Sequence, residues 1–470
     1  MPFSNAVEPG LENGITQAEG LEIAQAFEAA GADAIIPRVE FFNTHKATGK
    51  KDSTHFPDVA LYPEAPAYAA ANSVDIKHHG VGGWVPLAAA LKKTVQIPVI
   101  TVGRLDAQTG EEILKQGHAD FISLNRRLIA DHDYPDKIFA GKFEDIAPCT
   151  ACQTCFNDGE AGNFVRCRIN AAAFKEKEYA LKPAAPGKKV VVIGGGPAGM
   201  EAARVAALRG HKVTLIEKEP DVGGAMNLAA VIKGSDREDL PGMIDYLKTQ
   251  IVKAGVDILL GHEADRKLVE SFQPDAVVVA IGGIHDIPRI PGIEKSNVLT
   301  GQALHHQLQN YLNLTGVRIM TKLAAHYISI GKSIIIIGGH IQGCQTAEFL
   351  VKRGRQVTIV ETGPEIGAGF MPFQIKPQLI DWLDKKDVPM LTGVTIESVT
   401  DHGLNIIDKS DQRQTLEADA VLTALPLLPN RELYNQLKDV VPEVHCIGDC
   451  RQPGLIIDAI ADGSRIAREI

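Results

Sequence analysis

The sequence has no long apolar run and no basic face, and these two absences exclude large classes of protein. Its longest apolar segments have the length of a strand, whereas a helix that crosses a membrane needs about 20 apolar residues. Lys and Arg number 48 against 58 Asp and Glu, so the net charge is −10 and a nucleic-acid partner is not expected. No signal-peptide pattern opens the sequence. We therefore expect a cytoplasmic protein that acts on a small molecule.

Cysteine is also scarce, with seven in 470 residues, which is too few for a disulfide scaffold. Four of them nevertheless lie close together in the sequence: Cys149, Cys152, Cys155 and Cys167. C-x2-C-x2-C is a spacing with which bacterial ferredoxins bind a [4Fe–4S] cluster. A structural zinc and unligated thiols are the alternatives, although zinc ribbons more often use two separated C-x2-C pairs. The other three cysteines are expected to be small core residues, and they are Cys344, Cys446 and Cys450.

The first third of the chain alternates helical patterns with short apolar strands between Gly14 and Arg127. Thr16 and Glu19 are spaced as a capping box at the start of a helix. Such βα units predict parallel strands, in a doubly wound sheet or in a (β/α)8 barrel. An irregular stretch within this region contains Tyr62, His78 and His79, which we expect to be loop residues rather than catalysts.

Two of the predicted strand ends in this region are followed by an arginine. Gly103-Arg104 follows one strand, and Asn125-Arg126 follows the next. In barrels, the loops after the last two strands commonly bind a phosphate group, and arginine suits that dianion. A surface salt bridge is the alternative for either side chain alone.

The segment from Val190 to Gly199 reads as a strand, a G-x-G-x-x-G turn and the start of a helix. Its glycines are Gly194, Gly196 and Gly199, and they permit a tight turn that lets backbone N–H groups approach a pyrophosphate. Glu217 closes the next predicted strand, where an acid accepts hydrogen bonds from an adenosine ribose. This combination predicts a dinucleotide-binding βαβ unit.

The same unit occurs twice. Lys189–Glu217 aligns without a gap with Ser333–Glu361, so the sequence predicts a second dinucleotide site. Its glycines are Gly338 and Gly343, but His340 replaces the glycine over which a pyrophosphate normally lies. Glu361 has no arginine directly after it, which favours NAD over NADP. A domain that binds nothing is the alternative.

Together these segments resemble the old yellow enzyme-type iron–sulfur flavoproteins, the group of 2,4-dienoyl-CoA reductase, enoate reductases and trimethylamine dehydrogenase. The resemblance covers about Gly14 to Ile470. It is most specific around the two strand-end arginines, the cysteines, the first glycine-rich turn with Glu217 and Gly223-Gly224, and Gly448-Asp449 near the end of the chain.

The resemblance implies an α/β protein with the C-terminal part of a (β/α)8 barrel, a [4Fe–4S] segment and a glutathione-reductase-like pair of FAD and NAD(P) domains. The expected segments are a partial FMN barrel of about three βα units (1–140), the iron–sulfur segment and linker (141–186), the FAD domain (187–300 and 426–470) and an inserted NAD(P)- or ADP-binding domain (301–425).

The resemblance also implies roles for single residues. Arg104 and Arg126, with Gly103, would face the FMN phosphate, and the four clustered cysteines would ligate the iron–sulfur cluster. The FAD would be held by Gly194, Gly196, Gly199, Glu217, Gly224 and Asp449. NAD(P)H would lie at the second turn, with Gly338, Gly343 and Glu361.

The sequence departs from the family at four places. Two residues lie between the second and third cysteines, where the family usually has three. Asn125 replaces a glycine, and His340 replaces another. The largest departure is that only about 140 residues precede Cys149, whereas a full barrel takes about 250. We therefore expect an oligomer or a partner chain to cover the half barrel, and no catalytic acid can be named.

The function implied is an NAD(P)H-dependent oxidoreductase in which electrons pass from NAD(P)H to FAD, to [4Fe–4S] and to FMN, and reduce an activated C=C bond. Enoates and dienoyl-CoA thioesters are the expected substrate class. Two alternatives stay open, namely an amine dehydrogenase of the trimethylamine dehydrogenase type and a non-catalytic electron-transfer subunit.

Overall fold

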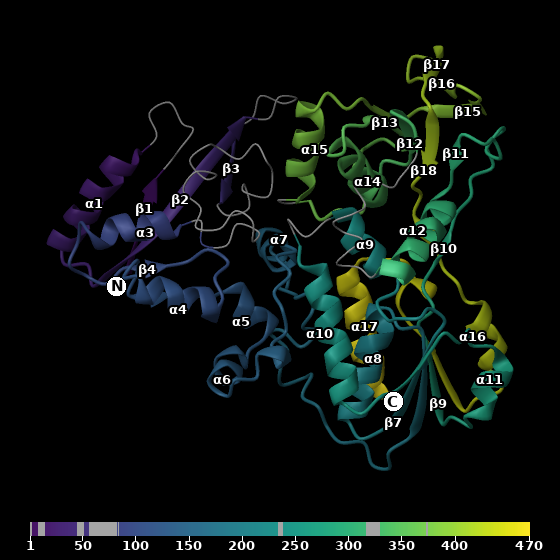
Figure 1. Cartoon of the computed structure of the whole chain (residues 1–470), viewed down its shortest axis with the longest axis horizontal. Helices are drawn as coiled ribbons and strands as arrows, with labels where there is room; N and C mark the ends of the chain where they lie inside the picture. The colour runs from purple at the N-terminus through teal and green to yellow at the C-terminus, as the bar shows by residue number, and fades with distance from the viewer. Residues whose placement is uncertain are drawn as a thin grey trace. The chain divides into compact units, whose positions relative to one another are not determined.

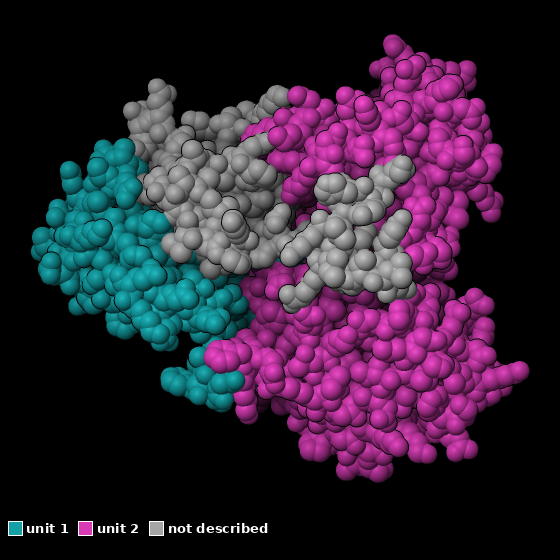
Figure 2. Space-filling model, viewed as in Figure 1, with its two compact units in different colours: residues 1–141, 236–238 teal, residues 142–235, 239–470 magenta. Residues whose placement is uncertain are grey.

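The computed structural model describes residues 2–7, 15–44, 51–55, 82, 84–233, 238–315, 330–372 and 375–470 (Figure 1). The chain divides into two compact units, which are coloured in Figure 2. The first comprises Met1–Gly141 with Asp236–Glu238, and the second Lys142–Ser235 with Asp239–Ile470. Within the described residues, no helix combines the length and the apolar character that crossing a bilayer requires.

The first unit contains parallel strands with helices between them. β1 pairs in parallel with β2, β4 pairs in parallel with β5, and a parallel bridge joins Ile35 of β2 to Val99 beside β4. The elements are β1 (Pro2–Val7), α1 (Gln17–Ala29), β2 (Ala34–Thr44), β3 (Lys51–His55), α3 (Val85–Lys92), β4 (Ile100–Thr101), α4 (Ala107–Lys115), β5 (Phe121–Ile122), α5 (Arg126–Ala130) and α6 (Tyr134–Phe139). The sequence pattern predicted parallel βα units correctly but missed β1 and also β3, which pairs antiparallel with the end of β2 in the stretch expected to be irregular.

Local capping and a small apolar core explain the start of this unit. The Thr16 hydroxyl accepts a hydrogen bond from the Glu19 N–H at 3.3 Å, and the Glu19 carboxylate accepts one from the Thr16 N–H at 2.8 Å. This reciprocal pair is the predicted capping box. Ala24 of α1 then packs with Ile35 of β2 and Leu91 of α3 in one buried cluster.

The second unit is built on a parallel five-stranded sheet with the order β20-β9-β6-β7-β8. Its strands are β6 (Lys189–Ile193), β7 (Lys212–Glu217), β8 (Asp257–Leu260), β9 (Ala276–Val279) and β20 (Glu443–Cys446). The helices α11 (Arg266–Ser271) and α16 (Glu432–Leu437) pack on the face that contains Val191 and Ile193. α8 (Pro197–Leu208), α10 (Leu240–Lys253) and α17 (Ile456–Glu469) lie side by side in Figure 1.

A second parallel sheet, with the order β11-β18-β12-β13-β14, is formed entirely by residues between β9 and β20. The last strand of the first sheet therefore comes from beyond the whole second sheet, and the second sheet is an insertion. Its elements are β11 (Val298–Leu299), β12 (Ser333–Ile337), α14 (Ile341–Val351), β13 (Gln356–Glu361), α15 (Ile375–Lys385), β14 (Met390–Thr392) and β18 (Ala420–Thr423). The antiparallel sheet of β15 (Thr395–Thr400), β16 (Gly403–Ile407) and β17 (Arg413–Glu417) follows β14.

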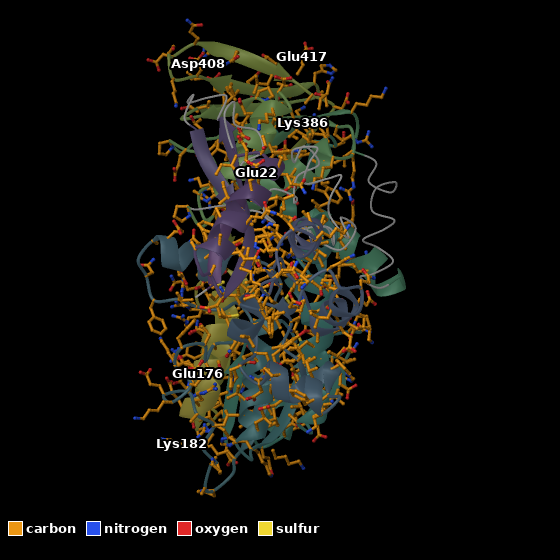
Figure 3. All side chains as sticks on the ribbon, turned by 90° about the vertical axis from the view of Figure 1, so that its left-hand side faces the viewer. Glu22, Glu176, Lys182, Lys386, Asp408 and Glu417 are labelled. Carbon is orange, nitrogen blue, oxygen red and sulfur yellow. The ribbon has the colours of Figure 1, made fainter. Side chains whose placement is uncertain are left out.

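The remaining described elements are a short antiparallel ladder and several helices. A two-stranded antiparallel ladder joins β10 (Ile284–His285) to β19 (Leu427–Leu428). The other helices are η3 (Phe143–Asp145), α7 (Thr154–Glu160), α9 (Ala225–Lys233), α12 (Gly301–Thr315) and η4 (Gly448–Cys450). Charged side chains such as Glu176, Lys182 and Glu417 are exposed (Figure 3).

The close contact between α8 and α17 gives a first prediction. A Cβ added to Gly463 of α17 would lie 2.3 Å from the carbonyl oxygen of Ala198 in α8, so Gly463→Ala forces the helices apart. We expect the variant to lose about 1–3 kcal/mol of unfolding free energy, measured by urea denaturation.

Gly159→Ala in α7 is the matched control, because no atom lies within 4 Å of the added Cβ there. It should be neutral or slightly stabilising, since glycine is unfavourable within a helix. Equal stability of the two variants would contradict the packing argument.

Candidate cofactor-binding sites

The first glycine-rich turn joins β6 to α8 and is closed by two contacts that only glycine permits. Gly194 has φ +105°, and a Cβ there would lie 2.3 Å from the carbonyl oxygen of Ala280. A Cβ on Gly199 would lie 1.9 Å from the carbonyl oxygen of Gly194. These two glycines therefore let α8 begin directly against the end of the sheet.

Gly196 differs from Gly194 and Gly199, because no contact within the described part of the chain requires a glycine at this position. Its φ of −73° suits any residue, and no atom lies within 4 Å of an added Cβ. The open space lies over the N-terminus of α8, where backbone dipoles favour an anion. Glycine at this position leaves room for a group outside the chain, such as a pyrophosphate, to approach the backbone.

Glu217 is buried at the end of β7 and holds the turn with both carboxylate oxygens. Oε2 accepts a hydrogen bond from the Gly195 N–H at 2.6 Å, and Oε1 accepts one from the Glu219 N–H at 2.9 Å. Each oxygen has a second lone pair, so a ribose hydroxyl can still donate to this side chain. The acid thus shapes the turn as well as offering acceptors.

The Gly223-Gly224 segment packs on the same turn. A Cβ on Gly224 would lie 3.0 Å from the Gly196 Cα, and the Gly223 N–H donates to the Gly195 carbonyl at 2.8 Å. Asn227, which the sequence analysis did not single out, donates through Nδ2 to the Val222 carbonyl at 3.1 Å. A polar residue three positions after a Gly-Gly pair was the available signal.

The second turn, between β12 and α14, repeats the first contact by contact. Gly338 has φ +111°, and a Cβ on Gly343 would lie 1.8 Å from the Gly338 carbonyl oxygen. Glu361 is also buried, and it accepts hydrogen bonds from the N–H groups of Gly339 and Gly363, each at 2.6 Å. The duplication therefore extends from the backbone to the side-chain hydrogen bonds.

His340 is where the two turns differ. It caps the N-terminus of α14 with φ −72° and ψ −177°, and Gly196 caps α8 with φ −73° and ψ −179°. Because the backbones match, the Cβ and imidazole of His340 start from the position that is left open over Gly196. The second turn thus has less room for a pyrophosphate than the first.

Asp449 lies in η4, directly after β20. Burial raises the pKa of its carboxyl above the ordinary range, while the Gly454 N–H donates to Oδ1 at 3.0 Å. The preceding Gly448 packs against the start of α8, since a Cβ on it would lie 3.0 Å from the Ala198 Cβ. The structure therefore brings the predicted Asp449 beside the first glycine-rich turn.

Asp462 of α17 supports this arrangement, and the sequence analysis did not identify it. Its carboxylate accepts a hydrogen bond from the Gly448 N–H at 3.1 Å and pairs with Arg451, whose Nη2 is 2.9 Å away. A carboxylate one helix turn after Asp458 gives no distinguishing pattern in sequence.

In the first unit, the predicted phosphate-site residues follow adjacent parallel strands. Gly103 and Arg104 come after β4, and Arg126 begins α5 after β5. Since the carboxyl ends of parallel strands meet at one edge of a sheet, both segments share that edge. Arg104 has φ +56°, a conformation that is uncommon for a residue other than glycine and that concentrates at functional sites.

Arg127, which was not predicted, ties these two segments together. Its Nε donates to the Leu105 carbonyl at 2.6 Å, and its Nη2 lies 3.8 Å from Asp106. Asp131 is buried and pairs with Lys137 at 2.7 Å. These side chains therefore hold the strand-end loops in place.

The four clustered cysteines lie on and around α7. Burial, followed by the neighbouring Cys152 and Cys149, raises the pKa of the Cys167 thiol to about 12. Ala151 and Gln153, on either side of Cys152, have φ values of +54° and +61°. Among the described residues, no three His, Cys, Asp or Glu side chains form a group that could hold a single metal ion. The cysteine ligand set stays a prediction.

An ion pair spans the cysteine segment. Arg166 donates through Nε and Nη2 to the two oxygens of Asp158, each at 3.0 Å, and Asp158 is buried. This bidentate pair positions Cys167 against the helix that contains Cys155. The residues Tyr62, His78 and His79 lie outside the described part of the chain.

Comparison with known proteins agrees with this geometry. The family model of the pyridine nucleotide-disulphide oxidoreductases matches residues 188–463. An NADH oxidase from Thermoanaerobacter brockii is 32% identical over 476 residues, which cover 100% of this chain and 66% of that protein. A cinnamate reductase from Clostridium sporogenes is 32% identical over 467 residues, which cover 98% of this chain and 62% of that protein.

Among solved structures, a 2-naphthoyl-CoA reductase superposes with a TM-score of 0.82 and 30% identity, covering 100% of this chain and 65% of its own. The chain thus spans about two thirds of the length of these relatives. The resemblance to the old yellow enzyme-type iron–sulfur flavoproteins is confirmed. The chain belongs to the pyridine nucleotide-disulphide oxidoreductase family.

Proposed function

We propose that this chain is the electron-delivering part of an NAD(P)H-dependent reductase that acts on an activated C=C bond, of the enoate or dienoyl-CoA type. The observation that supports this most strongly is the open space over Gly196 at the N-terminus of α8. A protein that uses a glycine where its own packing does not need one leaves room for a bound group. The relatives named cinnamate reductase and 2-naphthoyl-CoA reductase support the substrate class.

The residues fit the proposed cofactors to different degrees. The first turn, with Glu217 and Asp449, fits FAD, because glycines, a helix N-terminus and two carboxylates meet there. The second turn has glycines, a helix N-terminus and a carboxylate that would suit NAD(P)H, but the His340 side chain reduces the space for its pyrophosphate. Arg104 and Arg126 would hold the FMN phosphate, and the four cysteines would hold the iron–sulfur cluster. When bound, these groups carry hydride and single-electron chemistry that side chains alone do not supply.

The chain's own contribution is to bind and orient these groups. Glu217 and Glu361 each hold a turn in place by accepting a hydrogen bond from the N–H of Gly195 or Gly339, and the N–H groups at the start of α8 and α14 would then face the phosphates. We propose that protein outside this sequence completes the barrel, contributes the proton donor and covers the β4–β5 edge. A partner chain or a further segment of the same polypeptide would serve equally in this role.

A second candidate is amine oxidation, with the second turn holding ADP as a structural group. The relative named N,N-dimethylglycine/sarcosine dehydrogenase, which is 29% identical over 375 residues, supports this alternative. The two functions are separated by adding NADH to the purified protein under anaerobic conditions. Bleaching of the flavin absorption by NADH supports the reductase, whereas bleaching by a secondary amine but not by NADH supports the amine dehydrogenase.

The first cofactor prediction concerns Gly196. We expect Gly196→Ala to retain the stability of the cofactor-free protein, because the new methyl group meets no protein atom. Its affinity for FAD should fall about tenfold or more, since the methyl group occupies the place of a phosphate contact. Equilibrium dialysis measures the affinity, and thermal unfolding of the cofactor-free protein measures the stability.

Gly199→Ala is the contrasting variant, because its Cβ would lie 1.9 Å from the Gly194 carbonyl oxygen. It should lose stability whether or not FAD is present. Unchanged FAD affinity in Gly196→Ala would remove the main support for the proposed site.

The next prediction concerns His340. We expect His340→Gly to bind NADH about tenfold more tightly, equivalent to about 1.4 kcal/mol, because one clash is relieved and one N–H contact is gained. Titration of flavin reduction against NADH concentration measures the change. His402→Gly, in the exposed turn between β15 and β16, is the control and should bind NADH as the parent does. No difference between the variants would show that His340 does not limit access.

The last prediction concerns the cysteines. The protein should contain about four iron and four sulfide per chain, as a cube held by four thiolates requires. Cys152→Ala should lose this iron, because one corner of the cube is left without a protein ligand. Cys344→Ala, which removes a buried thiol elsewhere, should retain it. Stoichiometric zinc without labile sulfide would contradict the assignment.

A further inference from the structure

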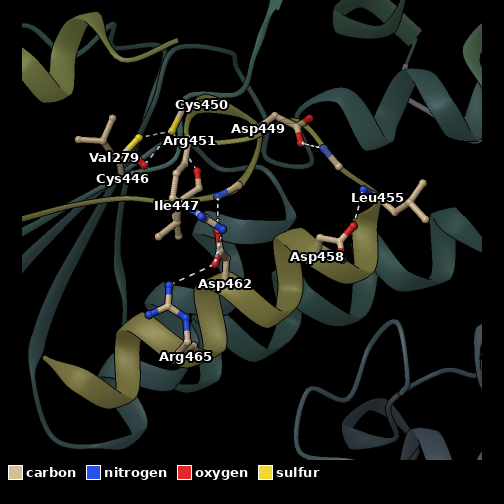
Figure 4. Close-up of polar contacts among 12 residues, drawn as sticks. Val279, Cys446, Ile447, Asp449, Cys450, Arg451, Leu455, Asp458, Asp462 and Arg465 are labelled. Carbon is tan, nitrogen blue, oxygen red and sulfur yellow. Dashed lines mark hydrogen bonds and ion pairs between the residues drawn. The ribbon is translucent and has the colours of Figure 1, made fainter. Parts of the chain in front are cut away.

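Two cysteines outside the clustered set, Cys446 and Cys450, lie against each other at the end of β20 (Figure 4). Cys446 is the last residue of β20, and Cys450 is the last residue of η4. Their sulfur atoms are 3.2 Å apart. A disulfide bond needs about 2.05 Å, so the two sulfurs are already within about 1 Å of bonding distance. The expectation that both are simple core residues is therefore incomplete, because the structure pairs them.

The two thiols differ in exposure. Cys450 is fully buried, and its sulfur lies 2.9 Å from the Ile447 carbonyl oxygen and 3.1 Å from that of Val279. Cys446 is only partly buried. A small oxidant therefore reaches Cys446 first, and Cys450 waits beneath it as the second thiol.

The two thiols also differ in acidity. The hydrogen bond from Cys450 lowers the pKa of Cys446, and the nearby guanidinium groups of Arg431 and Arg451 lower it further, against burial and the carboxylate of Asp462. The same contact, together with burial, raises the pKa of Cys450 well above its usual range. Cys446 thus has the thiolate character of an oxidation-sensitive cysteine, with a resolving cysteine at hand.

We propose that Cys446 and Cys450 are a peroxide-sensitive dithiol that closes to an intrachain disulfide. The Cys446 thiolate attacks hydrogen peroxide, so an S–O bond forms, the O–O bond breaks, and hydroxide leaves and takes up a proton to become water. The Cys450 sulfur then attacks the sulfenic acid, forming the S–S bond and releasing a second water. The two thiols together lose two protons and two electrons, and one peroxide becomes two waters.

Closure acts on the segment between the two cysteines, which contains Gly448 and Asp449. Gly448 has φ +64° and packs against Ala198, so the segment has little freedom to absorb a shift of its ends. Drawing the sulfurs together by about 1 Å moves η4 relative to β20. If Asp449 holds FAD, as the proposed function states, the disulfide form releases the flavin faster than the dithiol form.

The test uses the purified protein with its cofactors, treated with hydrogen peroxide, then alkylated and digested with trypsin. Asp439–Arg451 is one tryptic peptide, and it contains Cys446 and Cys450 and no other cysteine. We expect this peptide to be lighter by two hydrogen atoms and unalkylated after peroxide, and fully alkylated after dithiothreitol. Alkylation of both cysteines to the same extent before and after peroxide would overturn the proposal.

Matched variants separate the two thiols. Cys450→Ser should stop at a sulfenic acid on Cys446, trapped by dimedone, because no resolving thiol is left. Cys344→Ser, which removes a buried cysteine without a thiol neighbour in the described structure, should form the disulfide as the parent does. A disulfide-linked peptide in which Cys446 is joined to any cysteine other than Cys450 would contradict the pairing.

A separate measurement tests whether the disulfide weakens flavin binding. Free flavin fluorescence after gel filtration should rise severalfold on oxidation of the parent protein and not of Cys446→Ser. Equal release would overturn the coupling. Failure of the proposed function is distinguishable, because the reduced protein would then hold no FAD at all, while the peptide mass still reports the disulfide.

Discussion

The approach of Gly199 to the carbonyl oxygen of Gly194 is the contact on which the second unit depends. Any side chain at Gly199 would place a carbon 1.9 Å from that oxygen, so a glycine alone lets α8 start against the sheet edge. The first turn of α8 then becomes a meeting point for distant parts of the chain. Gly448 approaches the Ala198 side chain and Gly463 of α17 approaches the Ala198 carbonyl, so the C-terminal segment closes over the loop.

The duplicated turn keeps the same backbone in both copies although the residue at its middle position differs. Both copies keep the positive φ of the first glycine, the close approach of the last one and the buried acid that accepts an N–H group at 2.6 Å. These features hold the turn together, and a change in any of them would alter the fold. The middle position does not hold the turn together, because in the first copy no atom of the described residues lies within 4 Å of a Cβ built on Gly196. His340 therefore changes what the second turn can admit without changing its shape.

The second unit contains two separate sets of cysteines with different surroundings. Around α7, a strained backbone and the Asp158–Arg166 pair hold a set of cysteines whose spacing suits a cluster. At β20 and η4, two cysteines face each other with one partly exposed. Burial raises the pKa of Cys167 and contributes to the raised pKa of Cys450, whereas at Cys446 the hydrogen bond from the second thiol outweighs burial and lowers the pKa. The hydrogen bonds and charges around each set of cysteines differ, and these surroundings determine how readily a thiol ionises.

Short-range patterns in the sequence predicted the local structures well. The Thr16–Glu19 capping box depends on contacts within three residues, and the turns at Gly194–Gly199 and Gly338–Gly343 are each recognised from glycines within six residues, although Ala280 and Ala424 also contact them. The parallel βα character of both units followed from alternating strand and helix patterns. β1 was missed because a single short strand at the start of a chain has no repeat to identify it.

By itself, the sequence determined where a glycine permits a positive φ or a close approach and where Thr16 and Glu19 begin a helix, since these features depend on a residue's own backbone or on a partner three residues away. Only the tertiary structure decided that Asp462 holds Gly448, that β20 completes a sheet begun at β6, and that Cys446 faces Cys450. These arrangements depend on where separate segments meet around a shared core. Packing, which no local spacing encodes, sets those distances.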